Sequence, residues 1–277
     1  MSKLLIHLGP PKTGTTQFQT FLNSNTMALM RKSVDYIQCK PKKQIRSYFK
    51  AYKELNSHQL RNGNPLKPWY LDCPESYFFK NTSNNNAVIS EEALFKLVAF
   101  KNEISSFDKF LASYYSSRLY LVVLREVNAY TISKISQSIK GVWRFNYKNC
   151  VGELKRFSLD SNFLGIMDTK LTLEVAAFDD LIISPESMVN TSIILEDFFD
   201  ISNLDLKTVV GENNVSLGSE GTAIHMAYNN ILRLIMGDEK LRRLRPSIKP
   251  FARQFRTELL ENFPNQQKFC PYTEDEQ

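Results

Sequence analysis

Residues 9–16, the first loop, combine residue types that suit the binding of an anion: Gly9-Pro10-Pro11-Lys12-Thr13-Gly14-Thr15-Thr16. Lys12 supplies a full positive charge, and Thr15 and Thr16 supply hydroxyl donors. The apolar run 4–8 before the loop predicts a buried strand, and the apolar residues behind it have helical spacing from Thr15 on. A loop between a strand and a helix N-terminus directs backbone N–H groups and the positive helix end at a phosphate-like anion.

The spacing of the first loop differs from that of the nucleoside-triphosphate P-loop. That motif is GxxxxGK[ST], in which the Lys follows the second Gly directly. Here Lys12 stands two residues before Gly14, so the ATP-binding motif is not matched. The residues alone leave one alternative open, a strand–turn–helix whose Lys and Thr side chains are simply exposed.

Arg125 follows the clearest buried strand of the sequence, residues 119–124. An Arg at the carboxyl end of a parallel strand projects into the crevice where such sheets bind ligands, and its guanidinium suits a phosphate. Ser133 stands eight residues later, two turns into the next predicted helix, where its hydroxyl can donate to the same anion. The alternative for Arg125 is a surface ion pair.

Two acids, Glu91 and Glu92, follow a short predicted strand at Val88 and Ile89. Ser90 is expected to be the N-cap of the next helix, which the sequence predicts to continue through Phe100. Acids in a first helical turn are expected from the helix dipole alone, which is the structural interpretation of this pair.

At this point the sequence resembles the sulfotransferases that use 3′-phosphoadenosine 5′-phosphosulfate (PAPS). Their 5′-phosphosulfate loop is close to PKTGTT, which this chain has at residues 11–16, and the string from His7 to Thr16 resembles the bacterial branch in particular. A strand-end Arg with a Ser eight residues later, as at Arg125 and Ser133, is the second signature of the family. Residues 88–94 are similar to a segment that faces the acceptor in bacterial members.

The resemblance implies a role for each of these residues. Pro11, Lys12, Thr13, Gly14, Thr15 and Thr16 would hold the 5′-phosphosulfate, and Lys12 would also be catalytic. Arg125 and Ser133 would bind the 3′-phosphate. A general base is needed because a protonated acceptor hydroxyl is a poor nucleophile, and Glu92, or else Glu91, would be that base. His58 and Asp35 remain alternatives, and His7 is expected to support the first loop. No metal is implied.

The elements that must position these residues alternate along the chain. Further strands are predicted at 119–124 and 173–178, with helices around residues 130–139, 193–198 and 223–234, the last ended by Gly237. Strands alternating with helices predict an α/β fold, a three-layer α/β/α arrangement with a central parallel sheet and a P-loop-like phosphosulfate-binding loop. We expect one sulfotransferase domain over residues 1–277, with basic helical stretches at 40–53 and 240–256. The segment 212–217, with Ser216 as a helix N-cap, resembles a late cofactor-side loop.

Charge and composition limit the class of partner. The net charge of +6 is compatible with an anionic ligand but lower than nucleic-acid binders usually show, so no nucleic acid is expected. No apolar run is long enough for a transmembrane segment, and the first residues are not expected to be a secretion signal. Four widely spaced cysteines favour reduced thiols, so the protein is expected to be cytoplasmic.

The sequence therefore predicts a PAPS-dependent sulfotransferase that acts on an acceptor hydroxyl or amine and releases adenosine 3′,5′-bisphosphate. The basic stretches and the bacterial resemblance favour a carbohydrate or glycolipid acceptor. The alternatives are a P-loop kinase or nucleotide hydrolase, which would need ATP and Mg²⁺, and a non-catalytic nucleotide-binding protein. The identity of the acceptor and the oligomeric state stay open.

Overall fold

The computed structural model describes residues 2–9, 14–38, 44–48, 50–51, 67–72, 86–95, 101–125, 130, 133, 171–177, 185–207 and 219–262. The chain divides into two compact units, each described by itself below. The first unit comprises residues 1–125 and 160–211, and the second comprises residues 126–159 and 212–277. The single domain over 1–277 stays a prediction.

The described strands of the first unit form one parallel sheet in the order β2-β3-β1-β4-β5. Their bounds are β1 (Lys3–His7), β2 (Val34–Ile37), β3 (Asn86–Ser90), β4 (Ser117–Leu124) and β5 (Leu173–Ala177). β1 is the central strand, and its residues 4–6 are apolar and buried, as in a parallel sheet covered on both faces. The α/β fold class with a central parallel sheet, expected from the sequence, is confirmed.

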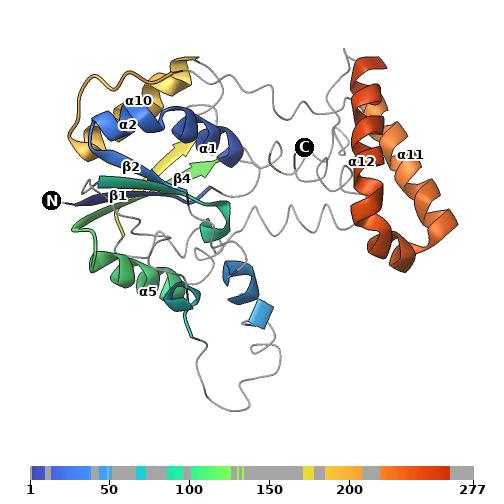
Figure 1. Ribbon diagram of the computed structural model, residues 1–277, viewed down its shortest axis with the longest axis horizontal. Coiled ribbons are helices and arrows are strands. Elements are labelled where there is room, and N and C mark those ends of the chain that lie inside the picture. The colour runs from blue at the N-terminus through green and yellow to red at the C-terminus, as the bar shows by residue number, and fades with distance from the viewer. Residues whose placement is uncertain are drawn as a thin grey trace, which may run out of the picture. The chain divides into compact units, whose positions relative to one another are not determined.

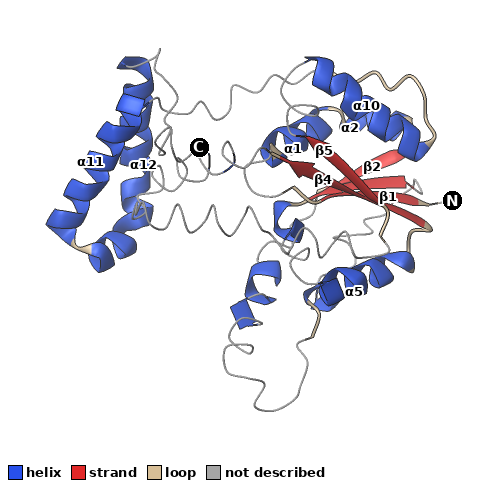
Figure 2. Ribbon diagram, turned by 180° about the vertical axis from the view of Figure 1, so that it is seen from behind, coloured by secondary structure: helices blue, strands red, loops and turns tan. Residues whose placement is uncertain are grey.

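Helices cover both faces of this sheet, so the first unit has three layers (Figures 1 and 2). α1 (Thr15–Ser24), α2 (Thr26–Arg31) and α10 (Pro185–Phe199) lie on one face, and α5 (Lys101–Ala112) lies on the other. Side chains of successive strand residues point to opposite faces. Accordingly Leu4 and Ile6 belong to the core under α5, whereas Leu5 belongs to the core under α1 and α10.

Two elements between β1 and β4 differ from the expectation. β2 was not predicted, because only four residues form it and two of them, Asp35 and Tyr36, are half-buried on an edge strand. The helix expected after Ser90 starts as a 3₁₀ turn, η3 (Glu92–Leu94), and Phe95 behind it is helical. Residues 96–100, over which the helix was expected to continue, lie outside the described residues, and α5 begins at Lys101. A second 3₁₀ turn, η1 (Trp69–Asp72), packs Trp69 against Phe107 of α5 at 5.4 Å between ring centroids.

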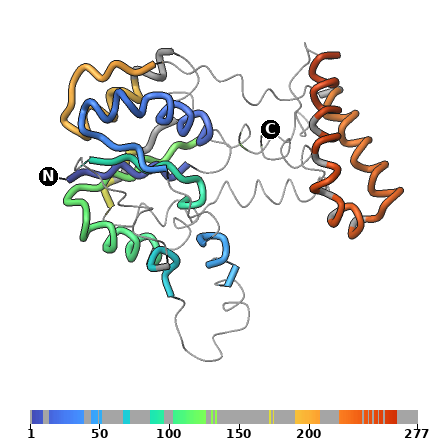
Figure 3. Tube along the Cα trace, in the orientation of Figure 1, coloured from blue at the N-terminus to red at the C-terminus, as the bar shows by residue number. Residues whose placement is uncertain are grey.

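The second unit contains the predicted C-terminal helices. α11 (Ser219–Met236) and α12 (Asp238–Asn262) lie side by side as a hairpin, joined at Gly237 (Figure 3). Gly237 has φ +73°, a backbone conformation that glycine adopts without a Cβ penalty, so the predicted helix end is confirmed. Aromatic rings join the two helices: Phe255 lies 4.7 Å from Tyr228 and 5.9 Å from His225. Among the helices of the described residues, none is both long and apolar enough to cross a membrane.

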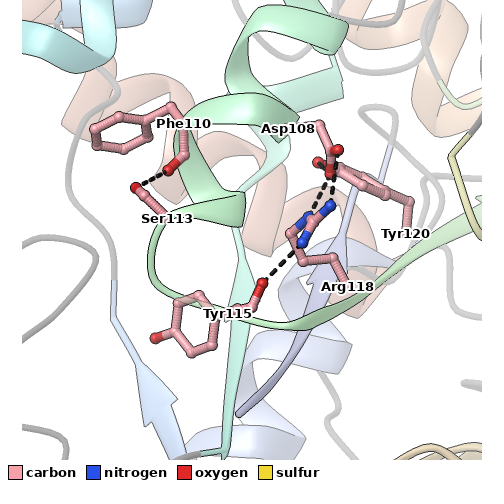
Figure 4. A network of polar contacts seen from close by, with 6 residues as sticks. All are labelled: Asp108, Phe110, Ser113, Tyr115, Arg118 and Tyr120. Atoms are coloured by element: carbon pink, nitrogen blue, oxygen red, sulfur yellow. Dashed lines mark hydrogen bonds and ion pairs between the residues drawn. The ribbon is translucent and has the colours of Figure 1, made fainter. Parts of the chain in front are cut away.

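A polar network fastens α5 to β4 in the first unit (Figure 4). The Arg118 guanidinium donates to both Asp108 carboxylate oxygens, at 2.7 and 3.1 Å, and to the Tyr115 carbonyl at 2.7 Å. Tyr120, which is buried, donates its hydroxyl to the same carboxylate at 2.9 Å. Burial, and then the Asp108 charge, raise the pKa of Tyr120 well above its ordinary 10.0, so Tyr120 stays protonated as a donor.

Asp108→Ala should lower the free energy of unfolding of the first unit by about 1.5–3 kcal/mol, because it removes hydrogen bonds to a charged group and leaves the buried Tyr120 hydroxyl unpaired. Urea unfolding followed by Trp69 fluorescence, in a Trp143→Phe background, measures this loss. Asp200→Asn is the matched control, since Asp200 pairs with Lys3 at the surface with 78% of its side chain exposed; it should cost less than about 1 kcal/mol. Equal losses for the two variants would contradict a special role for Asp108.

Candidate anion-binding site

The carboxyl edge of the sheet brings together the ends of three neighbouring strands. His7, the last residue of β1, pairs in register with Ser90, the last residue of β3, and with Leu121 of β4 on the other side. Leu8 continues the pairing by donating its N–H to the Leu121 carbonyl at 2.9 Å. After β1 the chain moves toward β2 and β3, and after β4 it moves toward β5. Such a reversal between adjacent strands is where open parallel sheets bind ligands.

The first loop begins at this edge, and its described residues form the N-terminus of α1. Gly14 is the N-cap, with φ 71°, and Thr15 is the first helical residue. The helix has no side-chain cap hydrogen bond and no acid in its first turn. Backbone N–H groups at a helix start have no partner within the helix, and the dipole makes this end positive. The start of α1 is therefore suited to an external anion.

Position 9 requires glycine because its neighbours leave no space for a Cβ atom. A Cβ at this position would lie 2.4 Å from Thr15 Oγ1 and 2.8–2.9 Å from two atoms of the His7 ring. Gly9 thus lies directly against the His7 side chain and the first residue of α1. A larger residue would push the loop away from the helix N-terminus.

His7 itself is fully buried beneath Gly9. Its Nδ1 lies 2.8 Å from Ser90 Oγ, and its ring packs on Phe18 of α1 with 4.5 Å between centroids. Burial lowers the pKa of His7 from 6.5 to about 3, so the ring is neutral at neutral pH. Nε2 has no hydrogen-bond partner among the described residues. The sequence expected His7 to support the first loop, and its ring indeed borders Gly9 and Thr15.

The predicted acids lie on the adjacent turn. Ser90, expected as the helix N-cap, is instead the last residue of β3, because the strand pairing with β1 extends through it. The N-cap of η3 is Glu91, whose buried carboxylate accepts the Ala93 N–H at 3.0 Å. Glu92 is half-buried, and its carboxylate forms no hydrogen bond or ion pair with any described residue.

A second contact joins this turn to the first loop. The Gln19 side chain, one turn into α1, donates to the Ser90 carbonyl at 3.0 Å. Together with the His7–Ser90 hydrogen bond, it ties β3 to both β1 and α1 one residue before Glu91. The sequence did not reveal these contacts, since they depend on the register of two strands that are about 80 residues apart.

The other predicted site residues have different outcomes. Arg125 follows β4 directly and is half-buried at the same edge of the sheet. Ser133 is helical and belongs to the second unit, so its approach to Arg125 stays a prediction. Asp35 pairs with Ala87, three residues before the end of β3, which places it about 10 Å from the carboxyl edge.

Several predicted residues lie outside the described part of the chain: Pro10, Pro11, Lys12, Thr13, His58 and residues 212–217. Within the described part, no three His, Cys, Asp or Glu side chains are grouped so that they could hold a metal ion. The expectation that no metal takes part therefore stays a prediction.

Comparison with solved structures finds proteins of similar fold. The fold is similar to the crystal structure of a sulfotransferase from Alicyclobacillus acidocaldarius, with a TM-score of 0.43 and 10% sequence identity. The match covers 83% of this chain and 94% of that chain. No protein-family model matches the sequence, and no curated protein matches it. The function is therefore inferred from the residues of this chain.

Gly9→Ala should destabilise the first unit by about 1–3 kcal/mol, because the added methyl group overpacks a region bounded by Thr15 and the His7 ring. Urea unfolding measures the change. In a Thr15→Ala background, where the nearest atom is gone, the same substitution should cost at least about 0.5 kcal/mol less, which is the coupling expected of residues in contact. Strictly additive losses would mean that the loop does not pack against Thr15 as the structure has it.

Proposed function

We propose that this protein is a sulfotransferase that moves a sulfuryl group from PAPS to an acceptor hydroxyl or amine. The observation that carries the proposal is the start of α1. Its N-terminus, without a side-chain cap or a first-turn acid, lies at the reversal between β1 and β4 and follows a loop whose sequence is similar to the 5′-phosphosulfate loop of sulfotransferases.

The residues at this edge fit the cofactor. Gly9 lies close against the Thr15 hydroxyl and the His7 ring, and a buried nitrogen of that ring has no partner among the described residues. The backbone N–H groups from Thr13 to Thr16 would bind the 5′-phosphate, with the helix dipole adding to the attraction. Lys12 would neutralise charge on the oxygen of the leaving phosphate. Arg125, with Ser133 as its predicted partner, would bind the 3′-phosphate.

Catalysis by these residues would consist of positioning and charge stabilisation, as in the related transfer of phosphoryl groups. When bound, PAPS supplies the sulfuryl group: its S–O bond to the 5′-phosphate breaks as the acceptor forms a new bond to sulfur. The proton of the acceptor needs a base in the site. We assign Glu92 to this role. The Glu91 carboxylate already accepts the Ala93 N–H as a helix cap, whereas the Glu92 carboxylate forms no hydrogen bond with a described residue.

The acceptor class is inferred from charge. The predicted basic stretch 240–256 lies on α12, where Lys240 and Arg243 are exposed and Arg243 also pairs with Glu239 at 2.6 Å. Exposed cations attract an acidic partner, so we propose a glycan or glycolipid acceptor with anionic groups, handled by a cytoplasmic enzyme.

Ligand-dependent stability tests the proposed function. Adenosine 3′,5′-bisphosphate without Mg²⁺ should stabilise the protein by roughly 3 kcal/mol at a hundredfold excess over its Kd, seen as a rise in melting temperature. ATP should act more weakly, with or without Mg²⁺. A preference for ATP that depends on Mg²⁺ would favour a kinase or nucleotide hydrolase instead. Binding of the bisphosphate without sulfuryl transfer to any glycan acceptor would favour a non-catalytic nucleotide-binding protein.

A variant of Arg125 adds specificity to this test. Arg125→Ala should weaken the binding of adenosine 3′,5′-bisphosphate by about 1.5–3 kcal/mol, the range for a charge-assisted hydrogen bond. It should change the binding of adenosine 5′-phosphosulfate, which lacks the 3′-phosphate, very little. Equal weakening of both ligands would assign Arg125 to the structure of the edge rather than to the 3′-phosphate.

Glu92→Gln should lower the turnover rate by roughly 10²–10⁴-fold while cofactor binding and stability are kept, because Gln preserves the shape of the side chain but not its basicity. Steady-state sulfuryl transfer measures the loss. The neighbouring variant Glu91→Gln is the matched control: its amide oxygen can still accept the Ala93 N–H, so turnover should hardly change. A large loss of turnover with Glu91→Gln and none with Glu92→Gln would exchange the two roles. Unchanged turnover in both variants would show that this turn does not supply the base.

A further inference from the structure

His7 joins the three elements, β1, β3 and α1, that meet at the anion site. It ends β1, its Nδ1 lies 2.8 Å from the hydroxyl of Ser90 on β3, and its ring packs on Phe18 of α1. The ring is fully buried, so these contacts fix its position and its plane. A side chain held in this way keeps the ends of β1 and β3 in a fixed position relative to each other.

The outer nitrogen of this ring remains unused. Nε2 is buried and has no hydrogen-bond partner among the described residues, which costs stability unless another state of the protein supplies a partner. The ring is neutral and carries a single proton. If the Ser90 hydroxyl donates to Nδ1, that proton is on Nε2, and Nε2 is then a neutral donor.

The space above Gly9 shows which group Nε2 can serve. A Cβ built on Gly9 would lie 2.9 Å from Nε2 and 2.4 Å from Thr15 Oγ1, so the two atoms border the same small space. Thr15 is the first residue of α1 and is itself buried. The two atoms are not hydrogen-bonded in the structure, where Nε2 has no partner among the described residues. A small shift on anion binding would let Nε2–H donate to Oγ1, and the Thr15 hydroxyl would then donate its own proton to the anion.

We propose that His7 is a positioning residue of the anion site: it aligns the Thr15 hydroxyl as a donor to the bound anion through Nε2, and it holds Ser90, two residues before Glu92, through Nδ1. The inference rests on the proposed function, since the anion is taken to be the 5′-phosphosulfate end of the cofactor. Ser90, His7 and Thr15 would form one chain of hydrogen bonds that ends on this anion.

Two amide variants separate the two nitrogens. In His7→Gln the amide reaches the position of Nε2, and in His7→Asn it reaches the position of Nδ1. Both variants lose the ring and its packing on Phe18, so their melting temperatures should fall by similar amounts. The Kd for adenosine 3′,5′-bisphosphate, measured by calorimetry, should stay within about threefold of wild type in His7→Gln and rise about tenfold or more in His7→Asn.

A Thr15 variant tests the connection itself. Thr15→Val keeps the shape of the side chain but removes the hydroxyl, so it should weaken binding in the wild type and add almost nothing in His7→Asn. Equal Kd values for His7→Gln and His7→Asn, or additive effects of Thr15→Val and His7→Asn, would reduce His7 to a packing residue and overturn the proposal.

Pyrophosphate is used as a second probe, because it separates an error in the role of His7 from an error in the proposed function. Wild-type protein that binds pyrophosphate but not the bisphosphate would overturn PAPS as the cofactor, while the same variants measured with pyrophosphate would still decide the role of His7. Wild-type protein that binds neither probe would overturn both proposals.

Discussion

The parallel pairing of β1 with β3 on one side and β4 on the other is the constraint on which the described site depends. The pairing sets His7 level with Ser90 and with Leu121, so the first loop, the Glu91–Glu92 turn and Arg125 all leave the sheet at one edge. Side chains alternate between the faces of a strand, and a slip of one residue would exchange them. Such a slip would remove His7 from α1 and force a polar ring into the core beneath α5. The buried apolar residues of β1 therefore fix the site as well as the fold.

The two helical N-termini at this edge differ in whether a side chain of the protein caps them. The 3₁₀ turn η3 is capped by the Glu91 carboxylate, which uses the positive end of that turn within the protein. α1 is longer, begins at Thr15 after the N-cap Gly14, and has neither a side-chain cap nor a first-turn acid. Since the dipole effect acts within the first turn, positive potential is kept at α1 and negative charge is placed at Glu91 and Glu92. This separation of charge suits a site that holds an anionic donor beside a base.

The sequence was sufficient for the features that local patterns encode. Continuous apolar runs marked β1 and β4, and the Gly and Pro residues after residue 8 marked the turn into α1. It failed where the structure depends on pairing between distant segments. β2 was missed because an edge strand of four residues shows no clear alternation, and Ser90 was expected to be a cap because nothing local shows that β3 extends to meet His7. The hydrogen bond between His7 and Ser90 follows only from that register.

Polar groups are handled differently at the two ends of the sheet. Toward the amino ends of β1 and β4, Arg118 and Tyr120 share Asp108, and Lys3 donates to the Phe198 carbonyl and pairs with Asp200. At the carboxyl end, within the part of the chain that the structure describes, His7 Nε2 is buried without a partner and α1 begins without a side-chain cap. Buried polar groups are normally satisfied, and natural proteins depart from that rule chiefly where a ligand completes the arrangement. The contrast within one sheet therefore supports the proposal of an anion site at the carboxyl edge, whereas the polar contacts toward the amino edge stabilise the fold.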